Sequence, residues 1–211
     1  SMQQFYIPSL SISDTKAWFD KEESKHLFKV LRKQSGDAVF ITNGKGVLFE
    51  GIIDTISSNK CEVSIQKTVQ YPPLPYRLHM AVAPTKMNDR FEWFLEKVTE
   101  IGVSEITPIL CERSERKTVK LERYQKILIA AMKQSLRTHL PLLHPLTSFE
   151  DFLIQHTSSK GLIAHCYNTP KKSLEKQVRS KEDVTLLIGP EGDFSQQEVK
   201  KAITSGYKPV S

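Results

Sequence analysis

The apolar positions of the first 71 residues form short runs separated by polar turns. Three runs have strand length, 38–42, 47–54 and 61–67. They are joined by Asn43-Gly44-Lys45-Gly46 and by Ser57-Ser58-Asn59, which are typical turn sequences. A short helix is expected over 22–32, because Leu27, Val30 and Leu31 recur on one helical face. The pattern predicts a small β-barrel or sandwich.

The pattern changes after Tyr71-Pro72-Pro73-Leu74-Pro75, since three prolines in four residues favour a stiff extended linker. Fully apolar runs at 78–83, 105–110, 161–166 and 184–188 then alternate with amphipathic helices at 90–101, 121–137 and 195–206 and a short helix near 174–178. Strands that are apolar throughout indicate a parallel sheet covered on both faces. We therefore expect two domains, 1–71 and 76–211.

Composition excludes several classes of protein. Of the 211 residues, 39% are hydrophobic and 26% charged, so the chain is globular rather than disordered. No apolar run approaches the roughly 20 residues that a membrane-spanning helix needs. The three cysteines are far apart and no C-x-x-C occurs, which argues against a disulfide framework and a thiolate zinc site. We expect a reducing, cytoplasmic location and no metal.

Charge suggests a polyanionic partner. The formal net charge is +6, of which residues 1–71 contribute +1 and residues 76–211 contribute +5. A basic surplus suits nucleic acid, although an ordinary solvated, lysine-rich surface explains it equally. The surplus is densest at 112–126, and Lys133 and Arg137 continue it on the following helix. Arginine and lysine near strand ends hold phosphates, but the same pattern also describes a solvated helix face.

The sharpest local pattern is the segment 187–195, Leu-Ile-Gly-Pro-Glu-Gly-Asp-Phe-Ser, between a buried strand and a capped helix. Ligands of open α/β sheets bind beyond the carboxyl ends of strands, and glycines allow close approach to the backbone. The alternative is a plain strand-to-helix turn. The segment is neither a P-loop nor a dinucleotide fingerprint, no G-x-S-x-G occurs, and the six histidines lack metal-ligand spacing. His165 could edge a pocket or be a core histidine.

These motifs together resemble the RsmE family, bacterial small-subunit ribosomal RNA methyltransferases that modify N3 of a uridine. The resemblance runs from about residue 5 to 211. In the second domain it rests on Lys86-x-x-x-Arg90, Lys97-Val98-Thr99-Glu100-Ile101-Gly102-Val103, Pro108, Arg113-Ser114-Glu115-Arg116, Gln134-Ser135-x-Arg137-x-x-x-Pro141 and Ile188-Gly189-Pro190-Glu191-Gly192. In the first domain it rests on His26-x-x-x-Val30-Leu31-Arg32 with Gly36-Asp37, which is similar to a PUA-like RNA-binding domain.

The resemblance implies an α/β fold in which a PUA-like β-barrel precedes a SPOUT domain with a parallel sheet and a trefoil knot. It implies S-adenosylmethionine as cofactor, 16S ribosomal RNA of the small subunit as partner, and a homodimer. The implied cofactor contacts are Leu162, His165, Leu187, Ile188, Gly189, Pro190, Glu191 and Gly192. The implied RNA contacts are Arg32, Lys86, Arg113, Arg116 and Lys117, and the catalytic candidates are Arg90, Arg137 and Glu191.

The chain departs from the family pattern at three places. Lys133 stands where a glutamate is usual, and Asp193 replaces the usual second glycine after Glu191. A glycine there permits a backbone angle that Asp tolerates only in part. The family also continues beyond the position of Ser211 with a segment that forms the last cofactor loop and closes the knot, so we expect an incomplete knot here.

Two other functions fit the same residues. One is a SPOUT methyltransferase with another RNA target, such as a ribose hydroxyl. The other is a non-enzymatic RNA-binding or ribosome-assembly protein that keeps the fold. A generic nucleotide-binding protein is disfavoured because the phosphate-binding motifs are absent.

Overall fold

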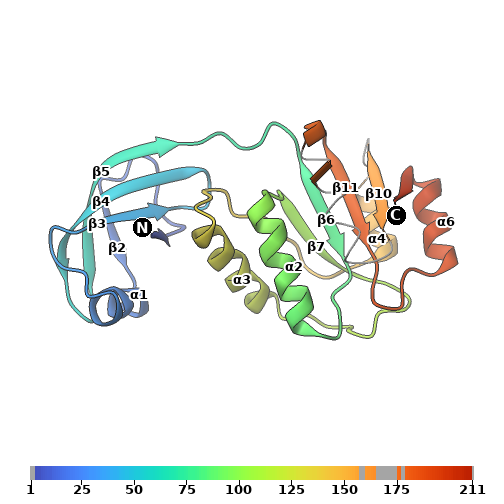
Figure 1. Cartoon of the computed structure of the whole chain (residues 1–211), viewed down its shortest axis with the longest axis horizontal. Helices are drawn as coiled ribbons and strands as arrows, with labels where there is room; N and C mark the ends of the chain where they lie inside the picture. The colour runs from blue at the N-terminus through green and yellow to red at the C-terminus, as the bar shows by residue number, and fades with distance from the viewer. Residues whose placement is uncertain (1–2, 157–159, 165–174, 177–178, 211) are drawn as a thin grey trace. The chain divides into compact units, whose positions relative to one another are not determined.

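The computed structural model describes residues 3–156, 160–164, 175–176 and 179–210 (Figure 1). Contacts divide the chain into two compact units. The N-terminal unit comprises Ser1–Pro73 with Met132–Leu140, and the C-terminal unit comprises Leu74–Ala131 with Pro141–Ser211. The chain thus leaves the C-terminal unit at Met132, contributes Met132–Leu140 to the N-terminal unit, and re-enters the C-terminal unit at Pro141.

The N-terminal unit is a curled five-stranded sheet in the order β1-β3-β4-β5-β2. The strands are β1 (Gln4–Tyr6), β2 (Lys16–Phe19), β3 (Ala38–Thr42), β4 (Val47–Ile56) and β5 (Cys61–Gln70). β1 pairs with β3 in parallel and the other pairs are antiparallel. Register shifts between β4 and β5, one of them at Gly51, mark irregularities of the kind that bend a sheet. A Cβ at Gly51 would lie 2.3 Å from Cγ1 of Val63, so the close approach of β5 requires glycine there.

Alternation along the strands places one face of this sheet in a core. Phe5, Leu27, Phe49 and Ile53 are all at most 2% exposed. The predicted helix at 22–32 is found as a short α-helix, α1 (Lys21–Lys25), followed by a π-helical turn, η1 (His26–Val30). The wider π-helical turn moves Val30 away from the buried face. Val30 is 66% exposed, so the prediction that it shares one face with Leu27 is wrong.

The segment Met132–Leu140 completes the N-terminal unit through its backbone. Gln4 Nε2 donates to the Arg137 carbonyl at 2.7 Å, and Gly46 N–H donates to the Thr138 carbonyl at 2.8 Å. Leu140 N–H donates to the Gly44 carbonyl at 2.9 Å. The segment therefore belongs structurally with the N-terminal sheet, although residues 71–131 separate it from the end of that sheet in the chain.

The C-terminal unit contains the predicted parallel sheet, in the order β12-β10-β11-β6-β7-β8, with β9 pairing to β7. All of its strand pairs are parallel. The strands are β6 (Leu78–Val82), β7 (Glu105–Leu110), β8 (Leu142–Leu143), β9 (Thr147–Ser148), β10 (Gly161–Ala164), β11 (Val184–Ile188) and β12 (Tyr207–Val210).

The longer helices of this part of the chain are α2 (Asn88–Ile101), α3 (Leu121–Gln134), α4 (Phe149–Gln155) and α6 (Gln196–Thr204). Figure 1 shows α2 on one face of the sheet, with α4 and α6 on the other. The α2 helix ends at Gly102 with a φ of 104°, as a left-handed C-terminal glycine does. Phe152, Ile163 and Leu187 belong to the core beneath α4 and α6.

The predicted fold class is confirmed as a curled PUA-like β-domain followed by a parallel α/β domain. The expected incomplete knot stays a prediction, and residues 165–174, between β10 and β11, lie outside the described residues. Most of the predicted helix at 174–178 also lies outside them. Within the described ranges, no helix combines the length and apolarity that crossing a membrane requires.

Candidate active site

Three loops meet at the edge of the parallel sheet where its central strands end. They follow β6, β7 and β11 and comprise residues 83–87, 111–120 and 189–195. β6 lies between β7 and β11, so the three loops are neighbours. Ala83 N–H donates to the Ile188 carbonyl at 2.9 Å, which joins the first loop to the end of β11. We call these three loops the rim.

The loop after β11 is shaped by its own backbone and by one buried ring. Asp193 N–H donates to the Pro190 carbonyl at 2.8 Å, which closes a tight turn. Asp193 has a φ of 69°, so the position does require the left-handed angle that a glycine adopts most easily. Its Oδ1 accepts from Phe194 N–H at 2.8 Å. A Cβ at Gly189 would lie 3.0 Å from the buried Phe194 ring, which explains the glycine there.

Glu198 joins this loop to the loop after β7. The predicted capping box opens α6, because Ser195 N–H donates to Glu198 Oε1 at 2.9 Å and Glu198 N–H donates to Ser195 Oγ at 3.2 Å. The second carboxylate oxygen of Glu198 accepts from Glu112 N–H at 3.0 Å. Burial, and then the nearby Glu198 charge, raises the pKa of the Cys111 thiol. Cys111 therefore stays a protonated thiol and makes a poor nucleophile.

Five of the predicted site residues meet on the rim through backbone contacts. Arg116 Nε donates to the Thr85 carbonyl at 2.9 Å, and its Nη2 donates to the Lys86 carbonyl at 3.0 Å. Lys86 N–H donates to Glu191 Oε1 at 2.8 Å. Arg113 Nη1 donates to the Gly192 carbonyl at 3.2 Å. The resemblance had suggested RNA or cofactor contacts for these side chains, and the structure adds that they hold the loops together.

The other predicted site residues are distributed more widely. Arg90 and Lys117 are exposed, in the first turn of α2 and in the loop before α3. Leu187 and Ile188 are fully buried within β11, and Pro190 is buried beside them.

Leu162 lies inside β10, in register with Leu186 and Lys208, rather than in a loop. His165, expected to follow it at the cofactor, lies outside the described residues. Arg32, exposed with a φ of 53°, and the half-buried Arg137 belong to the N-terminal unit, so their approach to the rim stays a prediction.

Sequence reasoning missed the part that two residues, Thr85 and Glu198, play in holding the rim. Thr85 is 1% exposed and its hydroxyl donates to the Met87 carbonyl at 2.8 Å. A lone threonine after an apolar strand carries no signal of such a role. Glu198 was identified as a helix cap, but its bond to Glu112 depends on tertiary structure.

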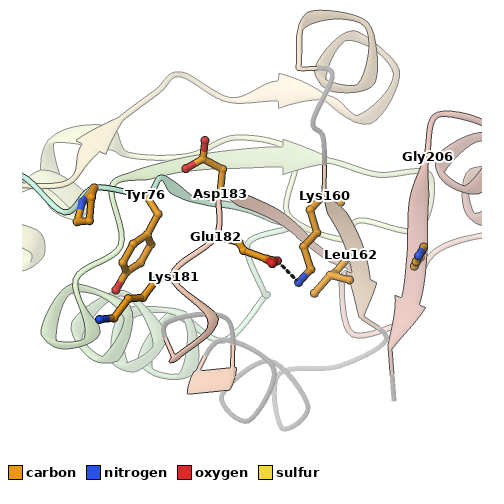
Figure 2. Close-up of a pocket in the computed structure, with 10 residues that line it drawn as sticks. Tyr76, Lys160, Leu162, Lys181, Glu182, Asp183 and Gly206 are labelled. Carbon is orange, nitrogen blue, oxygen red and sulfur yellow. Dashed lines mark hydrogen bonds and ion pairs between the residues drawn. The ribbon is translucent and has the colours of Figure 1, made fainter.

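A cavity of about 610 Å³ lies at the opposite, amino edge of the sheet. Figure 2 shows Lys160 turned toward Glu182, with 2.7 Å between Nζ and Oε2. Asp183 Oδ1 accepts from Arg77 N–H at 2.6 Å. The cavity is lined by residues at the start of the strands, whereas open α/β sheets bind ligands beyond the carboxyl ends. The rim, rather than this cavity, is therefore the candidate active site.

The amino edge also holds a histidine cluster. His79 is 2% exposed, its Nε2 lies 2.7 Å from Thr107 Oγ1, and its ring centroid is 4.8 Å from that of His156. Burial, helped by the nearby His156 and Arg77, lowers the pKa of His79 to about 3. Burial also lowers the pKa of His144, whose Nε2 lies 2.8 Å from Glu105 Oε1, and of His156. In the described part of the chain, no group of three or more His, Cys, Asp or Glu side chains is arranged to hold a metal.

Comparison with known families identifies both parts of the chain. Residues 72–211 match the model of an RNA methyltransferase domain, and residues 19–66 match that of an RNA methyltransferase PUA domain. The class of protein is thus an RNA methyltransferase whose catalytic domain follows a PUA domain.

Individual relatives narrow the class. A protein of Synechocystis sp. named ribosomal RNA small subunit methyltransferase E is 29% identical over 88% of this chain, which spans 63% of that relative's length. The crystal structure of a probable rRNA methyltransferase from Porphyromonas gingivalis is 35% identical, with a TM-score of 0.82 over 100% of this chain and 89% of that one. The methyltransferase E of Neisseria gonorrhoeae, solved bound to S-adenosyl methionine, is 26% identical, with a TM-score of 0.84 over 100% and 88% of the two chains.

The chain belongs to the RsmE family of RNA methyltransferases, as its motifs indicated.

Proposed function

We propose that the protein transfers a methyl group from S-adenosylmethionine to N3 of a uridine in 16S ribosomal RNA. The observation that carries the proposal is the rim itself, where three strand-end loops of a family methyltransferase domain are held together around Gly189–Gly192. A relative of the same fold was solved with this cofactor.

The residues of the rim fit the cofactor. Gly192 is exposed, its φ lies outside the left-handed region, and among the described residues the nearest atom to a Cβ built there is 3.5 Å away, on Arg113. The fold itself therefore does not require glycine at 192, in contrast to 189. A glycine without a conformational reason is expected where a ligand approaches the backbone closely. We infer that the backbone of Gly189–Gly192, above the buried Leu187 and Ile188, holds the adenosine side of the cofactor, with Leu162 and His165 as further candidates.

The cofactor supplies a methyl group on a sulfonium, whose leaving group is neutral and needs no acid. The protein must then hold N3 of the uracil in line with that methyl group, and orientation of this kind supplies much of the acceleration. The uracil N3–H must also be lost or polarised, so negative charge develops on the carbonyl oxygens. A guanidinium beside them would stabilise that charge by about 3 kcal/mol, by analogy with oxyanion donors. Arg90 and Arg137 are the candidates, and Lys117, Arg113 and Arg32 are candidates for phosphate contacts.

We propose further that the active protein is a homodimer. The proposal rests on the family resemblance, and Met87 and Trp93, at the N-cap and in the second turn of α2, are candidates for the interface because they are 66% and 52% exposed. Light scattering of the purified protein tests this: a mass of one chain at micromolar concentration would contradict it. An enzyme that acts on ribosomal RNA is also expected in the cytoplasm.

The decisive experiment is transfer of tritiated methyl groups by the full-length protein to small ribosomal subunits that lack the modification. The modified nucleotide is then located by mass spectrometry. Methylation at N3 of one uridine is the expected result. A methyl group on a ribose hydroxyl or on another base would show a different target. RNA binding without any transfer would indicate an assembly protein.

A further inference from the structure

Lys86 is the residue of the rim whose backbone is held from both sides. Its N–H donates to Glu191 at 2.8 Å, and its carbonyl accepts from Arg116 at 3.0 Å. The carbonyl before it, on the buried Thr85, accepts from the same guanidinium at 2.9 Å. Both peptide groups of Lys86 are thus fixed, while its side chain is exposed at the carboxyl edge.

The two residues that hold Lys86 come from different loops. Glu191 is 105 positions away in the chain and Arg116 is 30 positions away. The planar guanidinium presents Nε and one Nη as a rigid pair of donors, and these match two successive carbonyl groups. Arg113 adds a bond to Gly192, the neighbour of Glu191, so the two holding loops are also tied to each other. A change in any one loop would therefore be transmitted to the position of Lys86.

This geometry argues against direct chemical roles for the two side chains. A general base needs a lone pair aimed at the substrate, whereas one of the two carboxylate oxygens of Glu191, Oε1, already accepts from a backbone N–H. An arginine that reads RNA presents its donor fork to phosphate, but the Nε edge of Arg116 is directed at the chain's own carbonyls. Charged side chains used in this way fix a loop.

Building on the proposed methyl transfer, we propose that Arg116 and Glu191 are positioning residues. They hold Lys86 at the rim so that its ammonium contacts an RNA phosphate next to the methylated base. Neither of them touches the RNA or the reacting atoms. The residue that contacts the RNA is Lys86, and its fixed backbone sets where that phosphate lies.

The sharpest test compares two variants of one side chain. Glu191→Gln keeps a carbonyl oxygen for the Lys86 N–H but loses the charge, whereas Glu191→Ala loses the acceptor. We expect kcat to stay within about threefold for Gln and to fall by about 100-fold for Ala, the size of effect that a small misplacement produces. The pH profile of kcat should be unchanged in the Gln variant. A Gln variant as impaired as the Ala variant would overturn the positioning role.

The second comparison separates holding from contact at the arginine. Arg116→Ala should lower kcat while leaving the dependence of RNA affinity on salt unchanged. Arg116→Lys, whose single ammonium lacks the planar pair of donors that matches both carbonyls, should recover part of the loss. Lys86→Met should instead weaken RNA binding and reduce the salt slope by about one. Lys200→Met, an exposed lysine on α6, is the matched control and should change neither quantity. A reduced salt slope in Arg116→Ala would place that side chain on the RNA and reject the proposal.

Amide hydrogen exchange gives a readout that does not depend on methyl transfer. Exchange over residues 84–90 should accelerate in Glu191→Ala and Arg116→Ala, but not in Glu191→Gln or Lys86→Met. If exchange behaves in this way and the full-length protein methylates nothing, the proposed function fails and the holding role stands. If the protein methylates RNA but exchange is the same in all variants, the holding role fails alone.

Discussion

The two edges of the parallel sheet use charged side chains in opposite ways. At the carboxyl edge, Glu191, Arg113 and Arg116 bond to backbone groups of neighbouring loops. At the amino edge, charged groups mainly pair with one another, as in Lys160 with Glu182 and Arg77 with Glu105. Bonds from side chain to backbone fix the path of a loop, whereas pairs of side chains leave the backbone less constrained. The edge built to hold a defined shape is the one where the family pattern places its site.

The two edges of the sheet also differ in which groups they bury. The rim combines exposed cations with a backbone that is fixed by side-chain hydrogen bonds. At the amino edge, neutral histidines pack against the buried Phe152. Substitutions at the amino edge should therefore alter stability with little effect on RNA or cofactor. Substitutions at the rim should alter both. Three variants test this contrast, from the largest expected effect to the smallest.

Gly161→Ala at the amino edge should be the most destabilising. A Cβ there would lie 2.5 Å from the ring of Tyr207, which is buried and donates its hydroxyl to the His156 carbonyl at 3.2 Å. The ring cannot move aside cheaply, so we expect a loss of about 3 kcal/mol in the free energy of unfolding, the upper range for overpacking. Denaturant titration measures it.

Gly206→Ala is the matched control at the same edge. No described atom lies within 4 Å of a Cβ at 206, but its φ is 97°, so only backbone strain of about 1 kcal/mol is expected. Equal losses in the two variants would mean that crowding at Tyr207 is not what requires Gly161.

Glu198→Ala, next to the rim, should cost about 2 kcal/mol, because the buried Glu198 carboxylate is the acceptor for the N–H groups of both Ser195 and Glu112. In contrast to the glycine variants, it should also lower cofactor affinity, since it frees the loop after β11. Differential scanning calorimetry with and without S-adenosylmethionine measures both effects. Ser195→Ala, which removes only the cap, should cost about 1 kcal/mol. Cofactor binding unchanged in Glu198→Ala would show that the tie to Glu112 does not shape the site.

His79→Gln tests the amino edge through pH. Burial lowers the pKa of His79 in the folded protein to about 3, so below pH 6.5 the unfolded chain binds the extra proton. Stability from this group is therefore complete above pH 6.5 and falls with decreasing pH until about pH 3. The slope is about 1.4 kcal/mol per pH unit for one group. Glutamine can still bond to Thr107 but does not titrate, so the variant should lose less stability between pH 6 and 4.5. Parallel curves for the two proteins would exclude His79 as the cause.

Most of the fold could be predicted from the sequence, because local patterns of apolar and polar residues determine most of its helices and strands. Apolar runs located β7 and β11 at their observed bounds, and the capping box at Ser195 located the start of α6. The elements that were missed are short. β1 has three residues, one of them the buried polar Gln4, and α4 has only seven. Such segments are shaped by pairing with distant strands, which no local periodicity reports.

Residues of the rim were identified from the sequence, but the contacts between them were not. Glu191, Arg116 and Lys86 were all identified from motifs that lie far apart in the chain. Their meeting depends on the order of β11, β6 and β7 in the sheet. That order places Glu191 against a backbone N–H, and a motif shared with a family cannot reveal whether a carboxylate faces a ligand or its own chain. The requirement for a positive φ at Asp193, in contrast, followed from the single departure at that position.

Because Met132–Leu140 belongs to the first unit, a single cut in the chain cannot separate the two units. A fragment that ends at the proline-rich linker would keep all five strands of the first unit and still lack the carbonyl groups that Gln4 and Gly46 use. Transplanting this RNA-binding module onto another enzyme therefore calls for the nine-residue segment to be grafted with it. For such a graft, the boundary that must be respected lies inside α3, between Ala131 and Met132, and not only at the proline-rich linker.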